Sequence, residues 1–378
     1  MHIHLARKEL AKALDFIKSV VDARVSIPIL SNTRLEATGG RLTLSATDLD
    51  IEAKTSIEAD VKTPGEITVP ARTLADIIRK LAADQVTFEV KPGEGRMNLR
   101  SGRAKFHLPT LPPEDWPTLE REDMSHAFTL TAHAIARALK KTTFAISNEE
   151  TRYYLNGVFM HVAQVNGADM LRLVTTDGHR LARLEMPAPH GAPGMPGVII
   201  PTKTCAELAR MAEAALKDNK DTTPEIAIEV NERKIAFRCG DSVLLSKLID
   251  GNFPDYTRVI PAQNDKIAVI SRDAVTPAVE RVATIASERG RAVKLTIESD
   301  KLTLSVSSPD TGDASEEVEI DYDAYPVEIG FNHKYLVDGL NALDGDSARI
   351  ELADGSSPTL LRTAPDADLL IVLMPMRF

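Results

Sequence analysis

Two short polar segments carry the residues most able to do chemistry. In Thr176-Asp-Gly-His-Arg180 a carboxylate stands two residues before an imidazole, and such a pair could transfer a proton in acid–base catalysis. Asp48 and Asp50 could supply oxygen ligands to a two-metal site. A structural role is simpler, because Asp48, Asp177 and Asp310 each follow a strand-like segment and Asp commonly forms turns. We therefore predict no catalytic residue.

The sequence lacks the motifs that bind nucleotides, dinucleotides or catalytic zinc. It has no G-x-x-x-x-G-K-[ST], no G-x-G-x-x-G after a strand, no G-x-S-x-G and no H-E-x-x-H. The nine histidines do not cluster at ligand spacing, and Cys205 and Cys239 fit no zinc or redox pattern. We expect no metal, no cofactor and two reduced thiols.

The location of the protein can also be predicted from the sequence. No apolar run approaches the roughly 18 residues of a membrane span, and Met1-His-Ile-His-Leu-Ala-Arg7 lacks a signal-peptide core. These features predict a soluble, cytoplasmic protein.

The elements that hold these residues repeat three times along the 378-residue chain. Segments 65–81, 197–211 and 327–343 each contain a short apolar strand, a turn and an amphipathic helix. The register is strict, because equivalent positions are 131 residues apart. They are Pro70, Pro201 and Asn332; Arg72, Lys203 and Lys334; and Asp76, Glu207 and Asp338.

Two further sets of segments complete the repeat. Segments 41–49, 170–178 and 301–310 alternate like strands and end in the polar turns, and 9–23, 134–147 and 274–288 have helical apolar spacing. Pro- and Gly-rich stretches at 109–118 and 188–197 predict loops. A unit of about 130 residues can hold its own core. We predict an α+β protein of three similar domains, at residues 1–122, 127–261 and 262–378.

Charge is distributed unevenly over these elements. The net charge of −10 argues against a conventional basic DNA-binding domain. However, the six repeat helices with their flanks (8–24, 72–83, 131–147, 202–217, 272–291 and 333–343) carry 18 Lys and Arg against 10 Asp and Glu, a net +8, which leaves −18 elsewhere. Either these are ordinary solvated helix faces, or all three repeats present helices to one polyanion. The second arrangement would hold phosphates without reading bases.

Collinear motifs across the whole chain resemble the bacterial DNA sliding clamps, the β subunit of DNA polymerase III. They are Val69-Pro-Ala-Arg72, Arg100-Ser-Gly-Arg103, Arg152-Tyr-Tyr-Leu-Asn-Gly157, Thr176-Asp-Gly-His-Arg-Leu181, Asp250-Gly-Asn-Phe-Pro-Asp-Tyr256, Gly330-Phe-Asn332 and Met374-Pro-Met-Arg-Phe378. The resemblance implies a non-catalytic processivity factor. Two three-domain subunits would join head to tail in a ring with helices lining the hole and antiparallel sheets outside.

The resemblance also implies the partners. Duplex DNA would be held by topological linkage, without sequence preference. A clamp-loader ATPase would open the ring, and the replicative polymerase subunit, other polymerases and repair proteins would bind through short peptides.

The peptide-binding pocket would lie near the C-terminus, where Leu, Val, Pro and adaptable Met side chains suit several partners. Its first part would be Leu155, Thr176, Gly178, His179, Arg180, Leu181, Pro254, Arg258, Val259, Val372, Met374, Pro375, Met376 and Arg377. Its second lobe would be Arg152, Tyr154, Asn332 and Tyr335. The apolar segment from Leu369 is expected to be a last sheet strand whose tip reaches this groove.

Two other surfaces follow from the same resemblance. The DNA-facing residues would be Arg24, Arg72, Arg79, Lys80, Tyr153 and Lys203. The subunit interface would pair Arg96, Arg103, Lys105, Phe106 and Leu108 with Thr284, Ile285 and the acidic Asp310, Asp313, Glu316 and Glu317. The chain departs from the family at Asn148 and Glu149, where a carboxylate would repel phosphate, and at Thr284, where a larger aliphatic side chain is usual.

Two alternatives belong to other classes. A metal-dependent nuclease using Asp48, Asp50 or Asp177 would cleave DNA only with metal present. A scaffold of three repeated peptide-binding domains would be a monomer that does not link to DNA.

Overall fold

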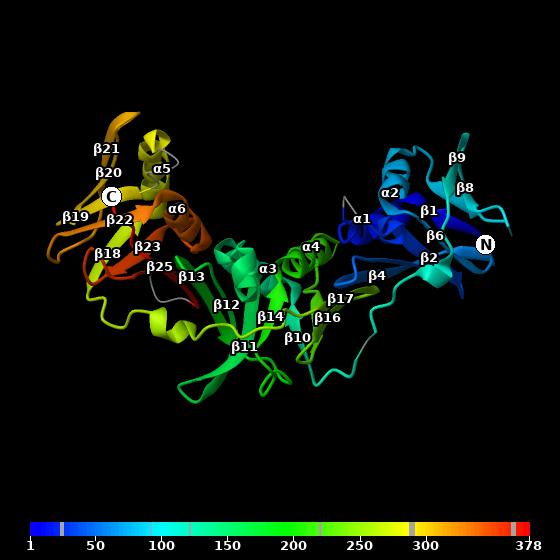
Figure 1. Ribbon diagram of the computed structural model, residues 1–378, viewed down its shortest axis with the longest axis horizontal. Helices are drawn as coiled ribbons and strands as arrows, with labels where there is room; N and C mark the ends of the chain where they lie inside the picture. Colours follow the sequence, from blue (N-terminus) through cyan, green and yellow to red (C-terminus); the bar gives the residue numbers. More distant parts are fainter. Residues whose placement is uncertain (23–25, 92, 121, 219–220, 287–291, 364–367) are drawn as a thin grey trace. The chain divides into compact units, whose positions relative to one another are not determined.

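The computed structural model describes residues 1–22, 26–91, 93–120, 122–218, 221–286, 292–363 and 368–378. Contacts divide them into two compact units. The first unit comprises Met1–Ala136, Pro189–Met195 and Lys203–Leu248, and the second comprises Arg137–Ala188, Pro196–Thr202 and Ile249–Phe378 (Figure 1). Because one segment of each unit interrupts the other, the central third of the sequence contributes to both.

The first unit is built on two antiparallel sheets. The smaller sheet, sheet A, has the order β5 (Asp60–Thr63), β1 (His2–Ala6), β7 (Gln85–Glu89), β8 (Arg96–Ser101) and β9 (Ala104–Pro109). The larger, sheet B, has the order β10 (His126–Thr131), β15 (Glu225–Val230), β16 (Lys234–Cys239), β17 (Ser242–Lys247), β4 (Ile51–Glu58), β3 (Arg41–Thr47), β2 (Asn32–Thr38) and β6 (Gly65–Pro70).

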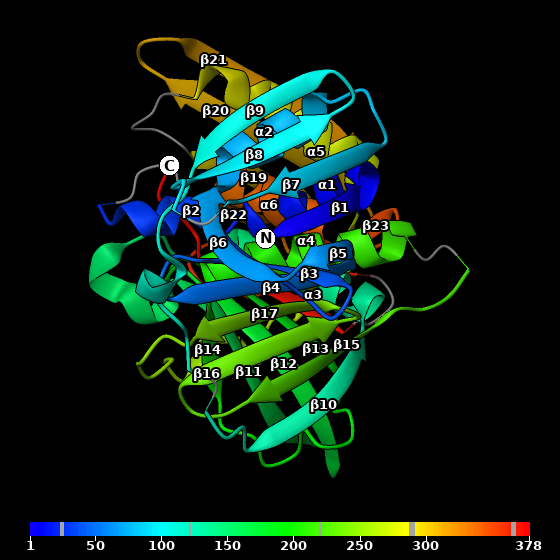
Figure 2. The same cartoon turned by 90° about the vertical axis from the view of Figure 1, so that its right-hand side faces the viewer.

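Sheet B joins two successive repeats. Strand β17 of the second repeat pairs with β4 of the first, in the register Val243 with Lys54 to Ser246 with Ile51. Figure 2 shows β3, β4, β17, β16 and β15 as neighbours in this sheet. The repeats are therefore hydrogen-bonded through their backbones rather than simply packed together.

Helices of the first unit bury one apolar face each. Helix α1 (Arg7–Ile17) buries Leu10, Ala13, Leu14 and Ile17, whose spacing forms one stripe. It packs against α2 (Ala71–Lys80) and against β4. Helix α4 (Thr202–Asp218) follows the short strand β14 and buries Cys205, Leu208, Met211 and other small residues. The other charged side chains of these helices are exposed or partly exposed, whereas Glu207 of α4 is buried and accepts hydrogen bonds from Ser19 and Arg210.

The second unit repeats this plan with two more antiparallel sheets. Sheet C has the order β14 (Val198–Pro201), β11 (Gly157–Val165), β12 (Ala168–Thr176), β13 (Arg180–Pro187), β25 (Leu369–Leu373), β24 (Thr359–Thr363), β23 (Ser347–Leu352) and β18 (Lys266–Ser271). Sheet D has the order β21 (Gly312–Glu319), β20 (Lys301–Ser308), β19 (Ala292–Glu298) and β22 (Val327–Asn332). The pairing of β13 with β25 again joins two repeats (Figure 1).

Helix α5 (Arg272–Val282) packs on α6 (His333–Ala342) and on strands β18, β20 and β21. Helix α3 (Ala132–Thr142) begins in the first unit and ends in the second. Short 3-10 helices occupy Pro28–Ser31 (η1), Pro113–Asp115 (η2), Thr143–Ala145 (η3), Glu150–Leu155 (η4), Tyr256–Val259 (η5) and Ala283–Ile285 (η6).

The strands and helices of the repeated strand–turn–helix segments are confirmed, but each helix begins directly after its strand, without the predicted turn. They are β6 with α2, β14 with α4, and β22 with α6. The strands predicted before the polar turns are confirmed as β3, β12 and β20, and the apolar C-terminal segment forms β25.

The predicted first helices of the repeats, however, are too long. They end at Ile17, Thr142 and Val282, where the sequence indicated 23, 147 and 288. The turns that follow still bury apolar residues, such as Val20 and Val21, and η3 and η6 continue the second and third helices. Apolar spacing therefore extends past the α-helical hydrogen bonds. Residues 23, 287 and 288 lie outside the described residues.

Within the ranges described, no helix combines the length and the apolar character needed to cross a membrane.

Candidate functional site

The turn between β12 and β13 is held by its own polar side chains. The Asp177 carboxylate accepts backbone N–H bonds from His179 at 2.9 Å and Arg180 at 3.0 Å. The Thr176 hydroxyl accepts from the Gly178 N–H at 3.1 Å, and Gly178 has φ +88°. Asp177 thus closes the turn, as the sequence predicted.

The first repeat contains the same turn. The Asp48 carboxylate accepts from the N–H groups of Asp50 at 2.9 Å and Ile51 at 2.8 Å, and the Thr47 hydroxyl accepts from Leu49 at 3.1 Å. Across the described parts of the chain, no three His, Cys, Asp or Glu side chains are grouped so that they could hold a metal ion.

An apolar cluster lies behind the turn in the second unit. Leu181 on β13 pairs with Val372 on β25, and both are buried with Val174, Leu360, Leu370 and Tyr256. Tyr256 belongs to the segment that precedes β18, and its hydroxyl hydrogen-bonds His161 at 3.0 Å and Arg172 at 3.2 Å. The cluster fixes this connecting segment against sheet C and leaves Val259 46% exposed beside it.

The polar network below Tyr256 supports the same segment. Arg172 donates to Glu185 at 2.6 Å, and Phe253 stacks on Phe159 with ring centroids 4.7 Å apart. Burial lowers the pKa of His161, and the neighbouring arginines lower it further against an opposing backbone hydrogen bond. His161 is therefore neutral near pH 7. It can hydrogen-bond the Tyr256 hydroxyl without adding another positive charge beside the neighbouring arginines.

Arg180 connects the turn to helix α6. Its guanidinium donates to Asp177 at 3.1 Å and to Asp338 at 2.6 Å, and it lies 4.2 Å from the centroid of the Tyr335 ring. His179 stacks on the same ring with centroids 6.4 Å apart. Asn332 caps α6 by accepting the Lys334 N–H at 3.0 Å. The turn and the start of α6 thus form one rigid wall.

Of the predicted second lobe, Arg152 and Tyr154 lie on η4, whereas Asn332 and Tyr335 lie at the start of α6. Arg152 donates twice to Glu149, at 2.8 and 2.6 Å, and this pairing lowers the pKa of the Glu149 carboxyl. A side chain at Gly178 would lie 2.5 Å from the Arg152 guanidinium. Leu155 is buried, and Tyr154 lies edge-on to Tyr153 at 5.8 Å. Glu149 is thus engaged by Arg152, which reduces the repulsion expected from that carboxylate.

The C-terminal residues run from the β12–β13 turn to strand β22. The Met374 N–H donates to the His179 carbonyl at 2.9 Å, and the Met376 N–H donates to the Gly330 carbonyl at 2.7 Å. The side chains of Met374 and Met376 are 39% and 37% exposed. Pro375 is partly buried between them, and Arg377 is exposed. Exposed Met and Val beside a rigid polar turn form a surface that can receive apolar side chains of a peptide.

Basic residues predicted to contact DNA already hold partners within the first unit. Arg72 donates to the Val21 carbonyl at 2.6 Å, and Arg79 donates to Asp15 at 3.0 Å. Lys203 donates to the Val20 carbonyl at 2.9 Å and to Asp22 at 2.7 Å, and it also contacts Asp48. Burial alone would lower the pKa of Lys203, but the two carboxylates outweigh it and raise the pKa.

The other predicted DNA-facing residues are placed as follows. Lys80 is exposed at the end of α2, and Tyr153 is 53% exposed on η4. Arg24 lies outside the described residues.

Two edge strands carry the residues predicted for subunit contact. Strand β9 is the outer strand of sheet A and bears Lys105, Phe106 and Leu108, with Arg96 on β8 and Arg103 in the hairpin between them. Strand β21 is the outer strand of sheet D and bears Asp313, Glu316 and Glu317. Each edge presents backbone groups that have no strand partner on that side among the described residues.

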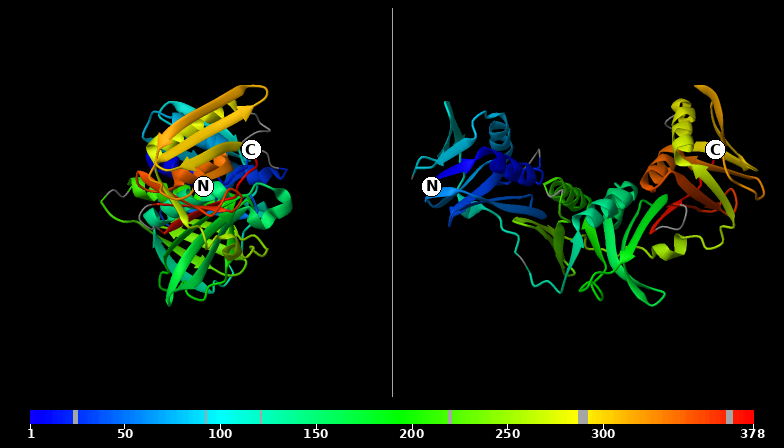
Figure 3. Two further views of the ribbon diagram at one scale, coloured as in Figure 1. Left: turned by 90° about the vertical axis from the view of Figure 1, so that its left-hand side faces the viewer. Right: turned by 180° about the vertical axis from the view of Figure 1, so that it is seen from behind.

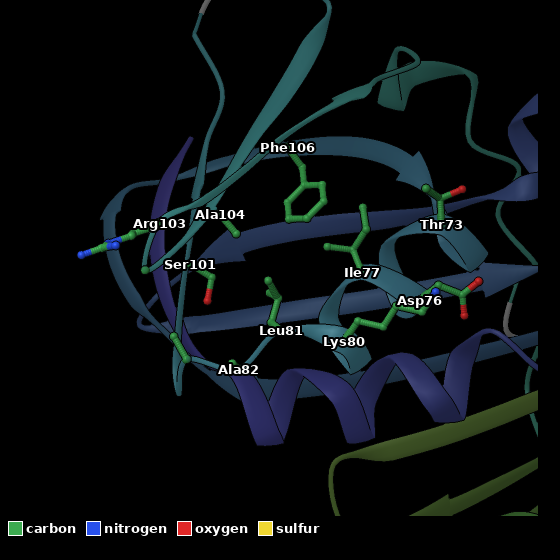
Figure 4. A pocket seen from close by; sticks show the side chains of 12 residues that line it. Thr73, Asp76, Ile77, Lys80, Leu81, Ala82, Ser101, Arg103, Ala104 and Phe106 are labelled. Atoms are coloured by element: carbon green, nitrogen blue, oxygen red, sulfur yellow. The ribbon is translucent and has the colours of Figure 1, made fainter.

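A cavity of about 660 Å³ lies between α2 and the β8–β9 hairpin. Figure 4 shows Phe106 and Ile77 pointing toward one another across it, with Leu81 at its base and Arg103 directed away. Among the residues predicted for the other side of the subunit interface, Thr284 donates to the Glu280 carbonyl at 3.2 Å, and Glu316 pairs with Arg281. Leu108 is buried within its own subunit, so its role would be to support Phe106.

Sequence reasoning missed several residues that organise these surfaces. Tyr256 and Phe253 lie in a quoted motif, but their burial depends on contacts with strands β11–β13. Asp338 was noted only as the third acidic position of the repeat register, and it proves to be the partner of Arg180. Gly330 also lies in a quoted motif, and the chain approaches it closely.

Comparison with known proteins covers the whole chain. Models of the DNA polymerase III β subunit match its N-terminal, central and C-terminal domains at residues 1–120, 129–255 and 257–377. The β sliding clamps of Caulobacter vibrioides and Escherichia coli K12 are 46% and 35% identical, each over 100% of both chains.

Solved structures agree with these matches. A sliding clamp of Bartonella birtlesii, described as bound to griselimycin, superposes with a TM-score of 0.95 at 43% identity over 100% of both chains. A Caulobacter crescentus clamp, described with PEG bound to a putative β-motif tethering region, gives 0.94 at 45% identity over 100% of this chain and 99% of that one.

Three domains of helices and antiparallel sheets, with these matches, define a DNA sliding clamp. The chain belongs to the DNA polymerase III β subunit family. Members are the non-catalytic processivity subunit, and the protein acts by binding DNA and polymerase partners.

Proposed function

We propose that two copies of this chain join head to tail and close a ring around duplex DNA. The observation that carries the proposal is the pair of open edges, β9 on sheet A and β21 on sheet D. Pairing β9 of one subunit with β21 of its partner would satisfy both edges. Because the contact joins two different surfaces, two such contacts close a finite ring.

Side chains beside the two edges are complementary. Lys105 lies on β9 with Arg96 and Arg103 beside it, and Asp313, Glu316 and Glu317 lie on β21. The cavity under Phe106 would receive Ile285 of the partner subunit, while Thr284 offers less apolar surface there. The charges favour correct docking more than tight binding.

DNA would be held by linkage, with weak phosphate contacts. Arg72, Arg79 and Lys203 share their charge with carbonyls and carboxylates of their own chain. Their attraction for phosphate is therefore moderated, which suits a ring that must slide. Lys80, Tyr153 and Arg24 complete the proposed contact set, with no base-specific reading.

The peptide pocket would lie between the Thr176–Leu181 turn, the Pro254–Val259 segment and the C-terminal tail. Its rigid walls are the Arg180–Tyr335–Asp338 network and the Tyr256 cluster. The adaptable part is Met374 and Met376, which are exposed. We propose that griselimycin, which the Bartonella relative binds, occupies this pocket here.

The partners follow from this arrangement. The replicative polymerase subunit, other polymerases and repair proteins would insert short peptides into the pocket, and tethering would raise their effective concentration at the primer end. A clamp-loader ATPase would open one interface. The domains would span residues 1–122, 127–261 and 262–378, and the protein would work in the cytoplasm, where bacterial DNA is replicated.

Retention on DNA of two shapes tests the ring. The protein is loaded with a bacterial clamp loader and ATP onto nicked circular plasmid, isolated by gel filtration, and half the sample is linearised. A ring stays on circles and leaves linear ends. Equal retention on both shapes would refute encirclement and favour binding by contact, and metal-dependent cleavage would favour the nuclease.

Deletion of Met374 to Phe378 tests the pocket. Griselimycin binding, followed by calorimetry, should be lost, while the dimer mass measured by sedimentation stays the same. Unchanged griselimycin affinity in the deletion variant would show that the pocket is elsewhere.

A further inference from the structure

The last five residues form an arm that backbone hydrogen bonds fix at its start and in its middle. Its start is fixed by the hydrogen bond from the Met374 N–H to the His179 carbonyl, 2.9 Å. Its middle is fixed by the bond from the Met376 N–H to the Gly330 carbonyl, 2.7 Å. Gly330 lies on β22, an outer strand of sheet D, so the arm occupies that edge of the sheet. Figures 1 and 3 show the C-terminus beside these strands.

Gly330 permits an approach that another residue would block. A Cβ atom there would lie 2.5 Å from the Met376 carbonyl oxygen and 2.5 Å from Cδ1 of Phe378. The backbone angle at Gly330 is not in the left-handed region, so the need for glycine arises from close packing. The Phe378 ring therefore packs directly against the backbone of Gly330.

The Phe378 ring also has a polar neighbour. Lys294, which pairs with Gly330 across the strands, places its ammonium 5.1 Å from the ring centroid. Glu328 holds that ammonium at 2.8 Å. A cavity of about 560 Å³ adjoins the ring and is lined by Lys294, Ser307, Asp313, Met376 and their neighbours. Phe378 is thus 64% exposed, yet Gly330 and Lys294 form a defined seat for its ring, that is, the surface on which the ring packs.

We propose that the seat formed by Gly330 and Lys294 anchors Phe378 and thereby holds Met374 and Met376 in place for peptide binding. This inference rests on the proposed peptide pocket. Phe378, Gly330 and Lys294 are positioning residues: they act through the arm, and the methionines touch the ligand. Apparent affinity equals intrinsic affinity multiplied by the fraction of molecules whose arm is seated.

The experiment measures binding of fluorescently labelled griselimycin to the full chain by anisotropy. Phe378→Ala removes the ring, and Gly330→Ala blocks its seat. If either change lowers the seated fraction to about a tenth, the dissociation constant rises roughly tenfold. Phe378→Leu keeps an apolar terminal side chain and should stay within about twofold of the unmodified protein.

A matched control and two further readouts separate positioning from general damage. Tyr325→Ala removes another exposed aromatic ring of the same unit, and it should leave the affinity unchanged. Melting temperature and retention on circular DNA should be the same for Phe378→Ala as for the unmodified chain. A methyl NMR spectrum should show shifted Met376 signals in Phe378→Ala without added ligand.

The outcomes are distinct. Full affinity in Phe378→Ala, with binding lost on deleting residues 374–378, would overturn the anchor and leave the pocket standing. Full affinity after the deletion would overturn both. Should Gly330→Ala fail to fold, Phe378→Ala and its rescue by Leu still decide the question, because Phe378 is mostly exposed.

Discussion

Leu49 and Gly178 occupy the same position in two repeated turns but differ in their side chains. Leu49 has φ +84° and Gly178 has φ +88°, and each donates its N–H to the Thr two residues before it. Glycine adopts this angle freely, whereas leucine pays about 1 kcal/mol or more in steric strain. The first repeat thus carries strain that the second avoids.

This strain predicts an unusual ranking of substitutions at position 49. Leu49→Gly should be more stable than Leu49→Ala by about 0.5–1 kcal/mol, because Ala keeps the Cβ that causes the strain. Thermal unfolding monitored by circular dichroism measures the difference. The matched change Gly178→Ala should destabilise, since it creates the strain and also approaches Arg152. A more stable Ala variant at position 49 would mean that the turn relaxes.

At the scale of single elements, helices of the repeats begin in different ways. The N-cap Asn332 of α6 accepts the Lys334 N–H, but Ser271 before α5 and Pro70 before α2 make no side-chain cap bond. A capping side chain typically contributes about 1 kcal/mol to helix stability. Helix α6 carries Tyr335, so the start of this helix matters for the wall that contains Arg180.

The difference in capping gives a matched pair of variants. Asn332→Ala should lower stability by about 1 kcal/mol, and Ser271→Ala should change it by less than about 0.5 kcal/mol. Denaturant unfolding of both variants provides the measurement. Griselimycin affinity should also fall only in Asn332→Ala, because the start of α6 supports Tyr335. Equal losses of stability in both variants would contradict the capping role.

Helices and strands could be predicted from the sequence where their apolar residues follow a single periodicity. The strands β3, β12 and β20 and the helices after β6, β14 and β22 follow from alternation and spacing in the sequence. The ends of α1, α3 and α5 were placed too late, because buried residues such as Val20 and Ile146 extend the apolar period into turns. Local patterns mark which face is buried but do not mark where helical hydrogen bonding stops.

Contacts between segments far apart in the sequence could not be predicted from these local patterns. The polar turn at Asp177 was predicted from residue type, and Asp48 fits the same rule. That Lys203 would reach Asp48, or Arg180 reach Asp338, depends on packing between segments about 155 residues apart. The peptide-pocket residues came from family resemblance, and Gly330 gave no sign that a terminal ring would rest on it.

For the whole molecule, assembly decides function. The six repeat helices with their flanks carry a net charge of +8, and the rest of the chain carries −18. A closed ring whose helices line the hole would therefore be basic on the inside and acidic on the outside. The ring in turn depends on Phe106 and the cavity beside it. A half-buried aromatic at the centre of an interface is a typical energetic hot spot.

Phe106→Ala should therefore weaken the dimer. Loss of about 2–3 kcal/mol raises the dimer dissociation constant by roughly 30- to 150-fold. Sedimentation velocity over a dilution series measures this change, and circular dichroism checks that the subunit stays folded. Tyr325→Ala serves as the control, because that ring is 85% exposed and outside the proposed interface. An unaltered dissociation constant would remove Phe106 from the interface.

The pairing of β17 with β4 has a consequence for pieces of this chain. A fragment ending near residue 122 would keep β4 but lose β17, and the ladder from Lys54 to Ile51 would become an open edge. Unpaired edges recruit strands from other chains, so the fragment should form oligomers that light scattering detects. A protease that cuts between the repeats would therefore yield aggregation-prone fragments rather than three independent modules.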